Sequence, residues 1–175
     1  MNHLEQEFNN ILKTYGHSVL LLHSDKKTVC DCYQRITGSA DKDCPYCFGM
    51  AYVPIIEKHL TRDVDMRVPE SLPYIASQQL FGDMAVATRA YYFKKDVVVK
   101  EYDLIIDVEW DGLTPIYRGG GIYEVSHIDP QRYLNGQITF QKVYVKDTPI
   151  KKTIRGLKIV QQAGKVLYQI AGLGE

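Results

Sequence analysis

Four cysteines are the residues of this chain whose type and spacing best suit chemistry. Cys30, Cys32, Cys44 and Cys47 form two close pairs separated by a short polar loop, and the 175-residue chain has no other cysteine. Thiolates are good zinc ligands, and two pairs can complete a tetrahedral site when the loop between them folds back. The pattern therefore predicts a structural Zn²⁺ site. Four thiolates leave no coordination position for water or substrate, so we do not expect a catalytic zinc.

The two halves of the cysteine pattern differ in regularity. Cys44-Pro45-Tyr46-Cys47 has the usual spacing, and Gly49 allows the backbone to turn away after it. Cys30 and Cys32 are separated by one residue only, which is tighter than the common turn. Disulfides, free thiols, an iron–sulfur centre and redox use are the alternatives. The first residues lack a basic stretch followed by an apolar one, so secretion is not indicated and disulfides are disfavoured.

Other polar side chains give weaker signals. His23 and His59 flank the cysteine region, but four cysteines suffice and we do not expect either histidine to be a ligand. A row of carboxylates would share one face of a strand, where it could bind a cation or, more commonly, form the wet side of a half-buried strand. These residues are Asp103, Asp107, Glu109 and Asp111.

No catalytic constellation is apparent. The glycine run 119–121 opens onto a strand-like segment rather than a helix, so it does not form a phosphate-binding loop. No serine lies in a Gly-x-Ser-x-Gly elbow. The sequence therefore predicts a protein that is not an enzyme and has no small-molecule substrate.

The N-terminal segment predicts a helix over residues 3–15. Asn2 could cap it and Gly16 is a natural stop. The apolar residues of this segment recur with helical spacing on one face, suited to packing on the core or to docking a partner. They are Leu4, Phe8, Ile11, Leu12 and Tyr15. Next come a strand at 17–23 and an extended segment at 50–66, in which Pro54 implies an edge or a bulge.

The second half of the chain is rich in strand signals. Short alternating runs over residues 83–146 are separated by turn residues, and Asn135-Gly136 indicates a hairpin. We expect a mainly β (α+β) fold built on a small antiparallel barrel or sandwich, with a C-terminal hairpin or arm from two strands near 157–160 and 165–170. The predicted division is an N-terminal helix and zinc-loop module at 1–68, a connector at 69–82, the β-domain at 83–146 and the hairpin or arm at 147–175.

The distribution of charge along the chain limits the classes of binding partner that we expect. The net charge is zero, which argues against a general nucleic-acid coat, and no apolar run reaches the length of a membrane span. Residues 142–165 nevertheless carry seven basic residues and one acidic residue. This segment is either the solvated face of a hairpin or a contact for DNA or an acidic partner, and the sequence leaves both open.

Several of these motifs together resemble virion structural proteins of tailed bacteriophages, in particular small β-barrel proteins of the neck and head-to-tail connector. The resemblance covers about residues 10–145 and rests on the order of a helix ending Tyr15-Gly16-His17, the cysteine loop ending Cys44-Pro45-Tyr46-Cys47-Phe48-Gly49, and two strand motifs. The strand motifs are Lys100-Glu101-Tyr102-Asp103-Leu104-Ile105 and Ile122-Tyr123-Glu124-Val125. The resemblance implies a non-enzymatic subunit of a homo-oligomeric ring, in contact with portal or adaptor and tail proteins, located in virions assembled in the bacterial cytoplasm.

Two other classes compete with the ring subunit. A zinc-ribbon nucleic-acid-binding module is the main alternative, but residues 25–67 hold seven basic and seven acidic residues, which is no electrostatic footprint for phosphate. A thiol oxidoreductase using Cys44 and Cys47 would need an accessible thiolate of low pKa, and a bound metal would quench it.

Overall fold

One helix and ten strands make up the described part of the chain. The computed structural model describes residues 3–41, 44, 46–47, 49–65, 89–117, 121–133, 136–148, 157–162 and 165–170. The elements are α1 (His3–Tyr15), β1 (His17–Val29), β2 (Tyr52–Asp65), β3 (Arg89–Lys94), β4 (Leu104–Asp107), β5 (Glu109–Asp111), β6 (Thr114–Ile116), β7 (Ile122–Tyr133), β8 (Gln137–Asp147), β9 (Leu157–Gln162) and β10 (Lys165–Ile170). The prediction of a mainly β protein with one N-terminal helix is confirmed.

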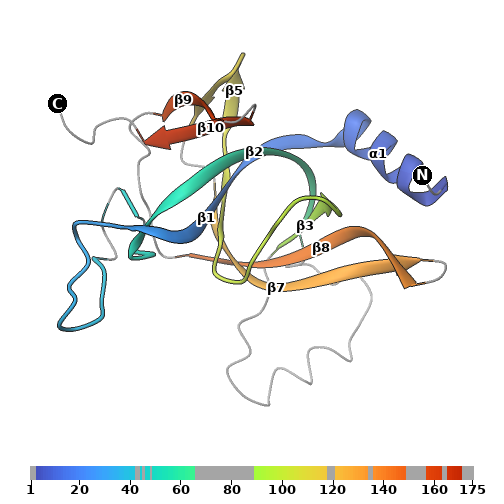
Figure 1. The fold of residues 1–175 in the computed structure, drawn as a ribbon. Helices are drawn as coiled ribbons and strands as arrows, with labels where there is room; N and C mark the ends of the chain where they lie inside the picture. Colours follow the sequence, from blue (N-terminus) through green and yellow to red (C-terminus); the bar gives the residue numbers. More distant parts are fainter. Residues whose placement is uncertain are drawn as a thin grey trace.

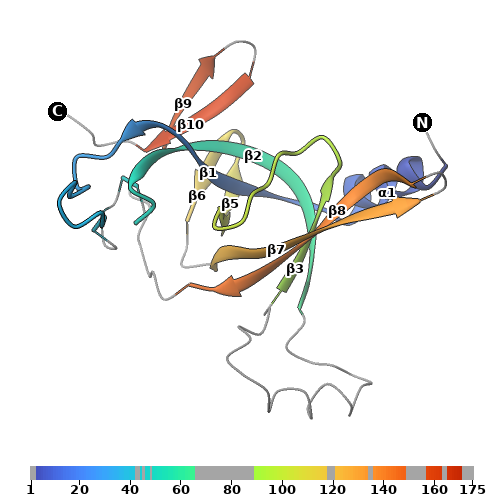
Figure 2. The ribbon, with the colours of Figure 1, turned by 60° about the horizontal axis from the view of Figure 1, so that its bottom comes forward.

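Six antiparallel strands form a closed barrel (Figures 1 and 2). Their order is β1-β4-β7-β8-β3-β2, and pairing of β1 with β2 closes the circle. The β7–β8 hairpin that the sequence predicted is present, with Tyr133 opposite Gln137. The fold is thus a barrel rather than a sandwich. Closure of the barrel removes the free edges of all six strands along their paired lengths.

The barrel begins earlier in the chain than the sequence indicated. β1 and β2 supply two of its six strands, although both fall in the range 1–68 that was predicted as a separate module. The barrel is therefore not confined to 83–146. The division failed because strand pairing joins segments that are distant in sequence, which local patterns do not encode. The predicted connector at 69–82 lies outside the described residues.

Apolar side chains pack on both faces of the barrel wall. The interior cluster includes Val19 and Leu21 of β1, Ile105 of β4 and Phe93 of β3. Alternate residues of the same strands point outward and form a second cluster with Tyr168 of β10. Burial on both faces explains why β1 and β4 are continuous apolar runs rather than alternating ones. The outward cluster is Leu20, Leu22, Ile56, Leu104, Ile106, Ile122 and Tyr168.

The helix α1 ends where predicted and lies against β8. The Gly16 amide donates to the Leu12 carbonyl at 2.9 Å, and a β-carbon at Gly16 would come within 2.2 Å of the same oxygen. Phe8 and Leu12 are buried, and the Phe8 ring stacks on Phe140 of β8 with centroids 4.6 Å apart. Ile11 remains 40% exposed. The helix therefore packs on the barrel while leaving part of its apolar face open.

The C-terminal segment forms the predicted hairpin. β10 pairs with β9 and also adds to β2 of its own chain, with Tyr168 opposite Ile56. The β5–β6 pair lies beside this hairpin (Figures 1 and 2). The indole of Trp110 in β5 donates to the Ser18 carbonyl at 2.7 Å and contacts the Tyr168 ring edge to face. The hairpin thus covers the outward apolar cluster of the barrel.

Candidate metal centre

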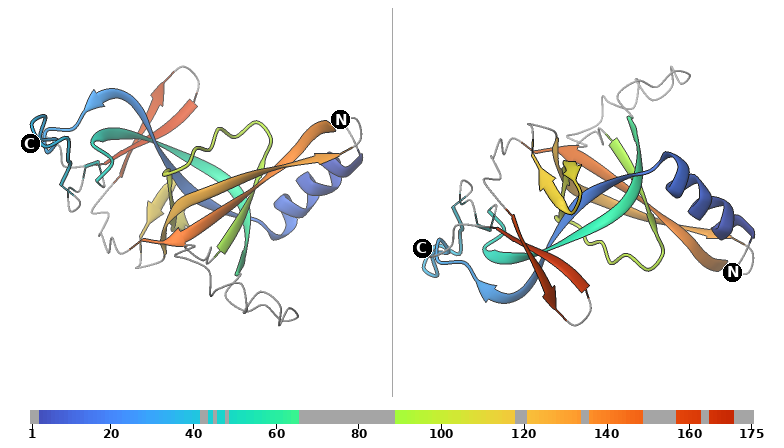
Figure 3. Two further views of the ribbon diagram at one scale, coloured as in Figure 1. Left: turned by 90° about the horizontal axis from the view of Figure 1, so that it is seen from below. Right: turned by 90° about the horizontal axis from the view of Figure 1, so that it is seen from above.

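The cysteine loop is the connection between β1 and β2. Val29 pairs with Tyr52, and the Cys30 amide donates to the Ala51 carbonyl at 2.9 Å. The ladder shifts register between Ser24, opposite Pro54, and Val29. Both the predicted placement of the loop between extended segments and the irregularity at Pro54 are confirmed. The loop projects from the end of the barrel opposite α1 (Figures 1 and 3).

Each cysteine pair lies on a tight turn. The Tyr33 amide donates to the Cys30 carbonyl at 2.9 Å, and the Met50 amide donates to the Cys47 carbonyl at the same distance. Gly49 has φ +79°, so the prediction that glycine lets the chain turn away after the second pair is confirmed. Pro45 lies outside the described residues.

The four sulfurs converge. All four Sγ atoms lie within 4.8 Å of one another, with Cys30 and Cys44 at 3.6 Å and Cys32 and Cys47 at 3.4 Å. None of these four cysteines forms a disulfide. A tetrahedral zinc with Zn–S bonds of about 2.3 Å has sulfurs about 3.8 Å apart along each edge. The side chains therefore fit a single four-coordinate metal ion.

Burial and backbone amides set the acidity of the thiols. Burial, together with the neighbouring Cys32 sulfur, raises the pKa of Cys47 to about 12. Burial opposes ionisation of Cys44 too, but hydrogen bonds with the backbone at Cys47 and Tyr46 outweigh it and lower its pKa to about 7. Three of the four cysteines are buried, and Ala40, Tyr46 and Val53 pack around them. The cluster is a shielded site rather than an open one.

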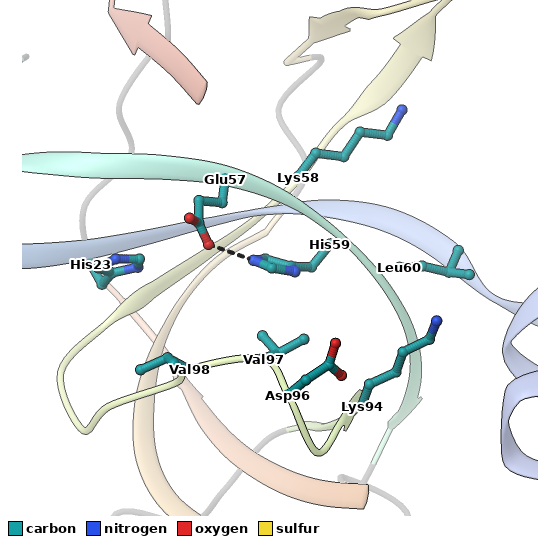
Figure 4. A pocket seen from close by; sticks show the side chains of 9 residues that line it. All are labelled: His23, Glu57, Lys58, His59, Leu60, Lys94, Asp96, Val97 and Val98. Carbon is teal, nitrogen blue, oxygen red and sulfur yellow. Dashed lines mark hydrogen bonds and ion pairs between the residues drawn. The ribbon is translucent and has the colours of Figure 1, made fainter. Parts of the chain in front are cut away.

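Neither histidine belongs to this centre. Within the described residues, the four cysteines are the one group of three or more potential metal ligands whose ligand atoms all lie within 4.8 Å of one another. His23 and His59 instead line a cavity of about 520 Å³ between β2 and the loop after β3 (Figure 4). His59 Nε2 lies 2.9 Å from Glu57 Oε2, and Asp96 and Val97 face this pair across the cavity. An imidazole–carboxylate pair can exchange a proton.

The predicted row of carboxylates does not form. Asp103 precedes β4 and is buried, with its carboxylate accepting from the Lys100 amide at 2.7 Å. Asp107 ends β4, whereas Glu109 and Asp111 lie in β5, which pairs with β6 in a separate two-stranded sheet. The single face shared by all four carboxylates is therefore wrong, because β5 belongs to another sheet, and the wet face is wrong for Asp103, which is buried. The apolar run of β4 is buried on both faces, so the residues at its ends are drawn inward.

Asp107 instead belongs to an ionic cluster at one mouth of the barrel. Arg89 Nη1 donates to Asp63 at 3.1 Å and to Asp107 at 3.3 Å, and the Tyr91 hydroxyl donates to Asp107 at 2.9 Å. His17 lies 3.8 Å from Asp63 and 3.9 Å from Asp107. This cluster was not predicted from the sequence, although charged residues at inward positions of alternating strands would have been a signal.

The basic segment 142–165 is partly engaged in the fold. Lys146 forms an ion pair with Glu124 at 2.8 Å, and Lys142 lies 4.8 Å from the centroid of the Tyr144 ring. The other five basic side chains of the segment lie outside the described side chains. Contact of this segment with DNA stays a prediction.

The one helix of the described residues is too short and polar to span a membrane. Neither the models of known protein families nor the curated proteins include a match to this chain.

Proposed function

We propose that the chain is a non-enzymatic structural subunit of a tailed-bacteriophage virion, which assembles into a ring at the neck or head-to-tail connector. The observation that carries the proposal is the position of the four-thiol cluster. It shapes a hairpin loop that projects from one end of a closed barrel, and three of its four cysteines are buried. Such a site suits a structural staple on a surface that contacts another subunit.

The metal that we propose is Zn²⁺, bound by Cys30, Cys32, Cys44 and Cys47. Four thiolates at these separations match its preferred ligand type and tetrahedral geometry. Bound zinc would tie the two ends of the loop together and add its binding free energy to the stability of the folded chain. Elemental analysis of the purified protein should give one zinc per chain.

Homo-oligomerisation is the decisive test of the ring. Native mass spectrometry and negative-stain microscopy of the purified, zinc-loaded chain should reveal a closed oligomer with a central opening. A strictly monomeric species at every concentration would contradict the ring. In a virion, the neighbours of such a ring would be portal or adaptor proteins on one side and tail proteins on the other, and assembly would take place in the host cytoplasm.

A zinc-ribbon nucleic-acid-binding module remains the second candidate, favoured by the +6 charge of residues 142–165. The exposed surface of the cysteine loop does not favour it, since its described charged side chains are Asp31, Asp41 and Arg35, with a net charge of −1. DNA binding that weakens steeply with salt, and that is lost when lysines of this segment are neutralised, would support this alternative.

A further inference from the structure

The tip of the cysteine loop presents one aliphatic side chain to solvent. Ile36 is fully exposed, at 101% of its reference surface, and it lies between the two cysteine pairs. The residues around it form a closed turn, in which the Gln34 amide donates to the Ser39 carbonyl at 2.9 Å and the Thr37 and Ser39 hydroxyls lie 2.7 Å apart. Gly38, at φ +67°, completes the turn. Ile36 is thus a knob held outward by a hydrogen-bonded turn and, at its base, by the metal cluster.

An apolar groove lies at the other end of the molecule, between α1 and the barrel. It has a volume of about 410 Å³ and is lined by Leu4, Phe8, Ile11, Val64, Tyr92 and Phe140. Ile11 and Val64 are 40% and 43% exposed, so the groove is open to a partner. The stacked pair of Phe8 and Phe140, which joins the helix to β8, lines the groove.

Charges at the two surfaces are complementary. Arg35, next to the knob, is exposed, and so is Asp31 at the base of the same loop. At the groove, Glu7 and Arg62 are both exposed and form its polar rim. The aliphatic knob and the apolar groove each have one cation and one anion beside them. When two copies meet, unlike charges can pair around the apolar contact, as in an interface with an apolar centre and a polar rim.

We propose that Ile36 of one copy inserts into the groove beneath α1 of the next copy, with Arg35 near Glu7 of that copy. This inference rests on the proposed ring function and specifies its subunit contact. The knob and the groove lie at opposite ends of the barrel (Figure 3), so Ile36 cannot reach the groove of its own chain. A contact between two different surfaces of the same protein is heterologous; it gives a ring when the rotation between copies closes, as the proposed function requires, and an open filament when it does not. The metal cluster would hold the knob in place before assembly, which lowers the entropic cost of the contact.

The first experiment compares assembly of full-length, zinc-loaded variants by native mass spectrometry and sedimentation across a concentration series. Ile36→Asp should raise the concentration needed for half-assembly at least tenfold. Leu113→Asp is the matched control, because Leu113 is also an exposed aliphatic residue, at 60%, and lies in the turn between β5 and β6. The control should assemble like the parent protein. Equal assembly of the Ile36→Asp variant and the parent would overturn the knob contact while leaving the ring intact.

A charge exchange tests the same contact from the groove side. Arg35→Glu and Glu7→Arg should each weaken assembly, and the double variant should restore it, because the exchanged pair is again complementary. Loss of assembly in both single variants without recovery in the double variant would contradict the pairing of these residues.

A photo-crosslinking amino acid at position 36 locates the contact directly. In a mixture of isotope-labelled and unlabelled chains, crosslinks should be intermolecular and should map to peptides from α1, β2 or β8 that line the groove. Crosslinks to another surface would show that Ile36 contacts a different site in the ring and would overturn the proposed contact with the groove. A parent protein that stays monomeric at every concentration would overturn the ring and the knob contact together.

Discussion

The hydroxyl of Tyr91 donates a hydrogen bond of 2.9 Å to Asp107 inside one mouth of the barrel. Tyr91 is completely buried, and its ring contacts those of Phe93 and Tyr123. Burial raises the pKa of Tyr91 far above that of a free phenol, and the Asp107 charge acts in the same direction. The phenol therefore stays protonated and serves as a donor to the carboxylate across the barrel.

Tyr91→Phe should destabilise the protein while preserving the fold. The change removes the donor to a largely buried carboxylate but keeps the aromatic ring, so we expect a loss of about 1–2 kcal/mol in the free energy of unfolding. Urea titration followed by circular dichroism measures it. Tyr133→Phe, at an exposed position of β7, is the control and should leave the midpoint unchanged. Equal unfolding midpoints for all three proteins would mean that the hydrogen bond from Tyr91 to Asp107 does not contribute to the free energy of unfolding.

Arg89→Met tests the ionic part of the same cluster. The guanidinium bridges Asp63 and Asp107, and its side chain and both carboxylates are about a quarter exposed. Its removal leaves two carboxylates close together without their shared cation, and we expect a loss of about 1–3 kcal/mol after allowance for solvent screening. Because those carboxylates would then repel each other, the loss should shrink as the pH falls toward 4. A pH-independent loss would assign the effect to packing alone.

The sequence predicted those features that local patterns encode. The helical spacing of apolar residues defined α1 at 3–15, and the helix spans those residues. Strand alternation and Asn135-Gly136 identified the β7–β8 hairpin. The spacing of the cysteines predicted their convergence, because two pairs on tight turns have few other ways to bury four thiols.

Features that depend on distant pairing escaped the sequence analysis. Val19 of β1 lies opposite both His59 of β2 and Asp107 of β4, and these two registers close the barrel. No local signal specifies that a strand near residue 20 pairs with one near residue 105. The inward turn of Asp107 follows from this register, which is why one carboxylate of the predicted solvent-facing row belongs to a half-buried ionic cluster at the mouth of the barrel.

Asp103 should make stability depend on pH. Burial raises its pKa to about 6, despite the opposing hydrogen bond from the Lys100 amide. An unfolded aspartate titrates near about 3.9, so between these values the folded protein binds more protons than the unfolded chain. The stabilising contribution is therefore fully present below about pH 4 and is lost as the pH rises toward 6, with a maximum size of about 3 kcal/mol.

Asp103→Asn isolates this effect. The amide oxygen can still accept from Lys100, and the side chain can no longer ionise. The difference in unfolding free energy between the variant and the parent should grow in favour of the variant from pH 4 to pH 6 and then stay constant. Asp111→Asn, on the exposed surface of β5, should show no such trend. A pH-independent difference for the Asp103 variant would refute the assignment.

Phe140→Ala should loosen α1 selectively. Phe140 stacks on Phe8 and also packs at 6.1 Å from the Tyr92 ring, so its removal takes away the main aromatic contact between the helix and β8. We expect amide exchange in α1 to accelerate several-fold while exchange in β1 and β4 stays slow, because both strands are buried on two faces. Ile138→Ala is the control, since Ile138 is exposed on the same strand. Uniform acceleration across the barrel would show that the helix is not a separate unit of stability.

Removal of the metal should act mainly on the loop. Cys44→Ser takes away one of the four proposed zinc ligands. The turns at Cys30 and Cys47 would then lose the proposed ion that joins them, so bound zinc should fall sharply and the melting temperature should drop. The paired stretch from His17 to Ser24 is held by apolar clusters on both faces of the wall, independently of the cysteines. Amide protection should therefore disappear at Cys30 and Met50 but persist at Leu20 and Leu21. A chelator should reproduce this pattern in the parent protein and change nothing in the Cys44→Ser variant. An unaltered melting temperature with zinc still bound to the variant would exclude Cys44 as a ligand.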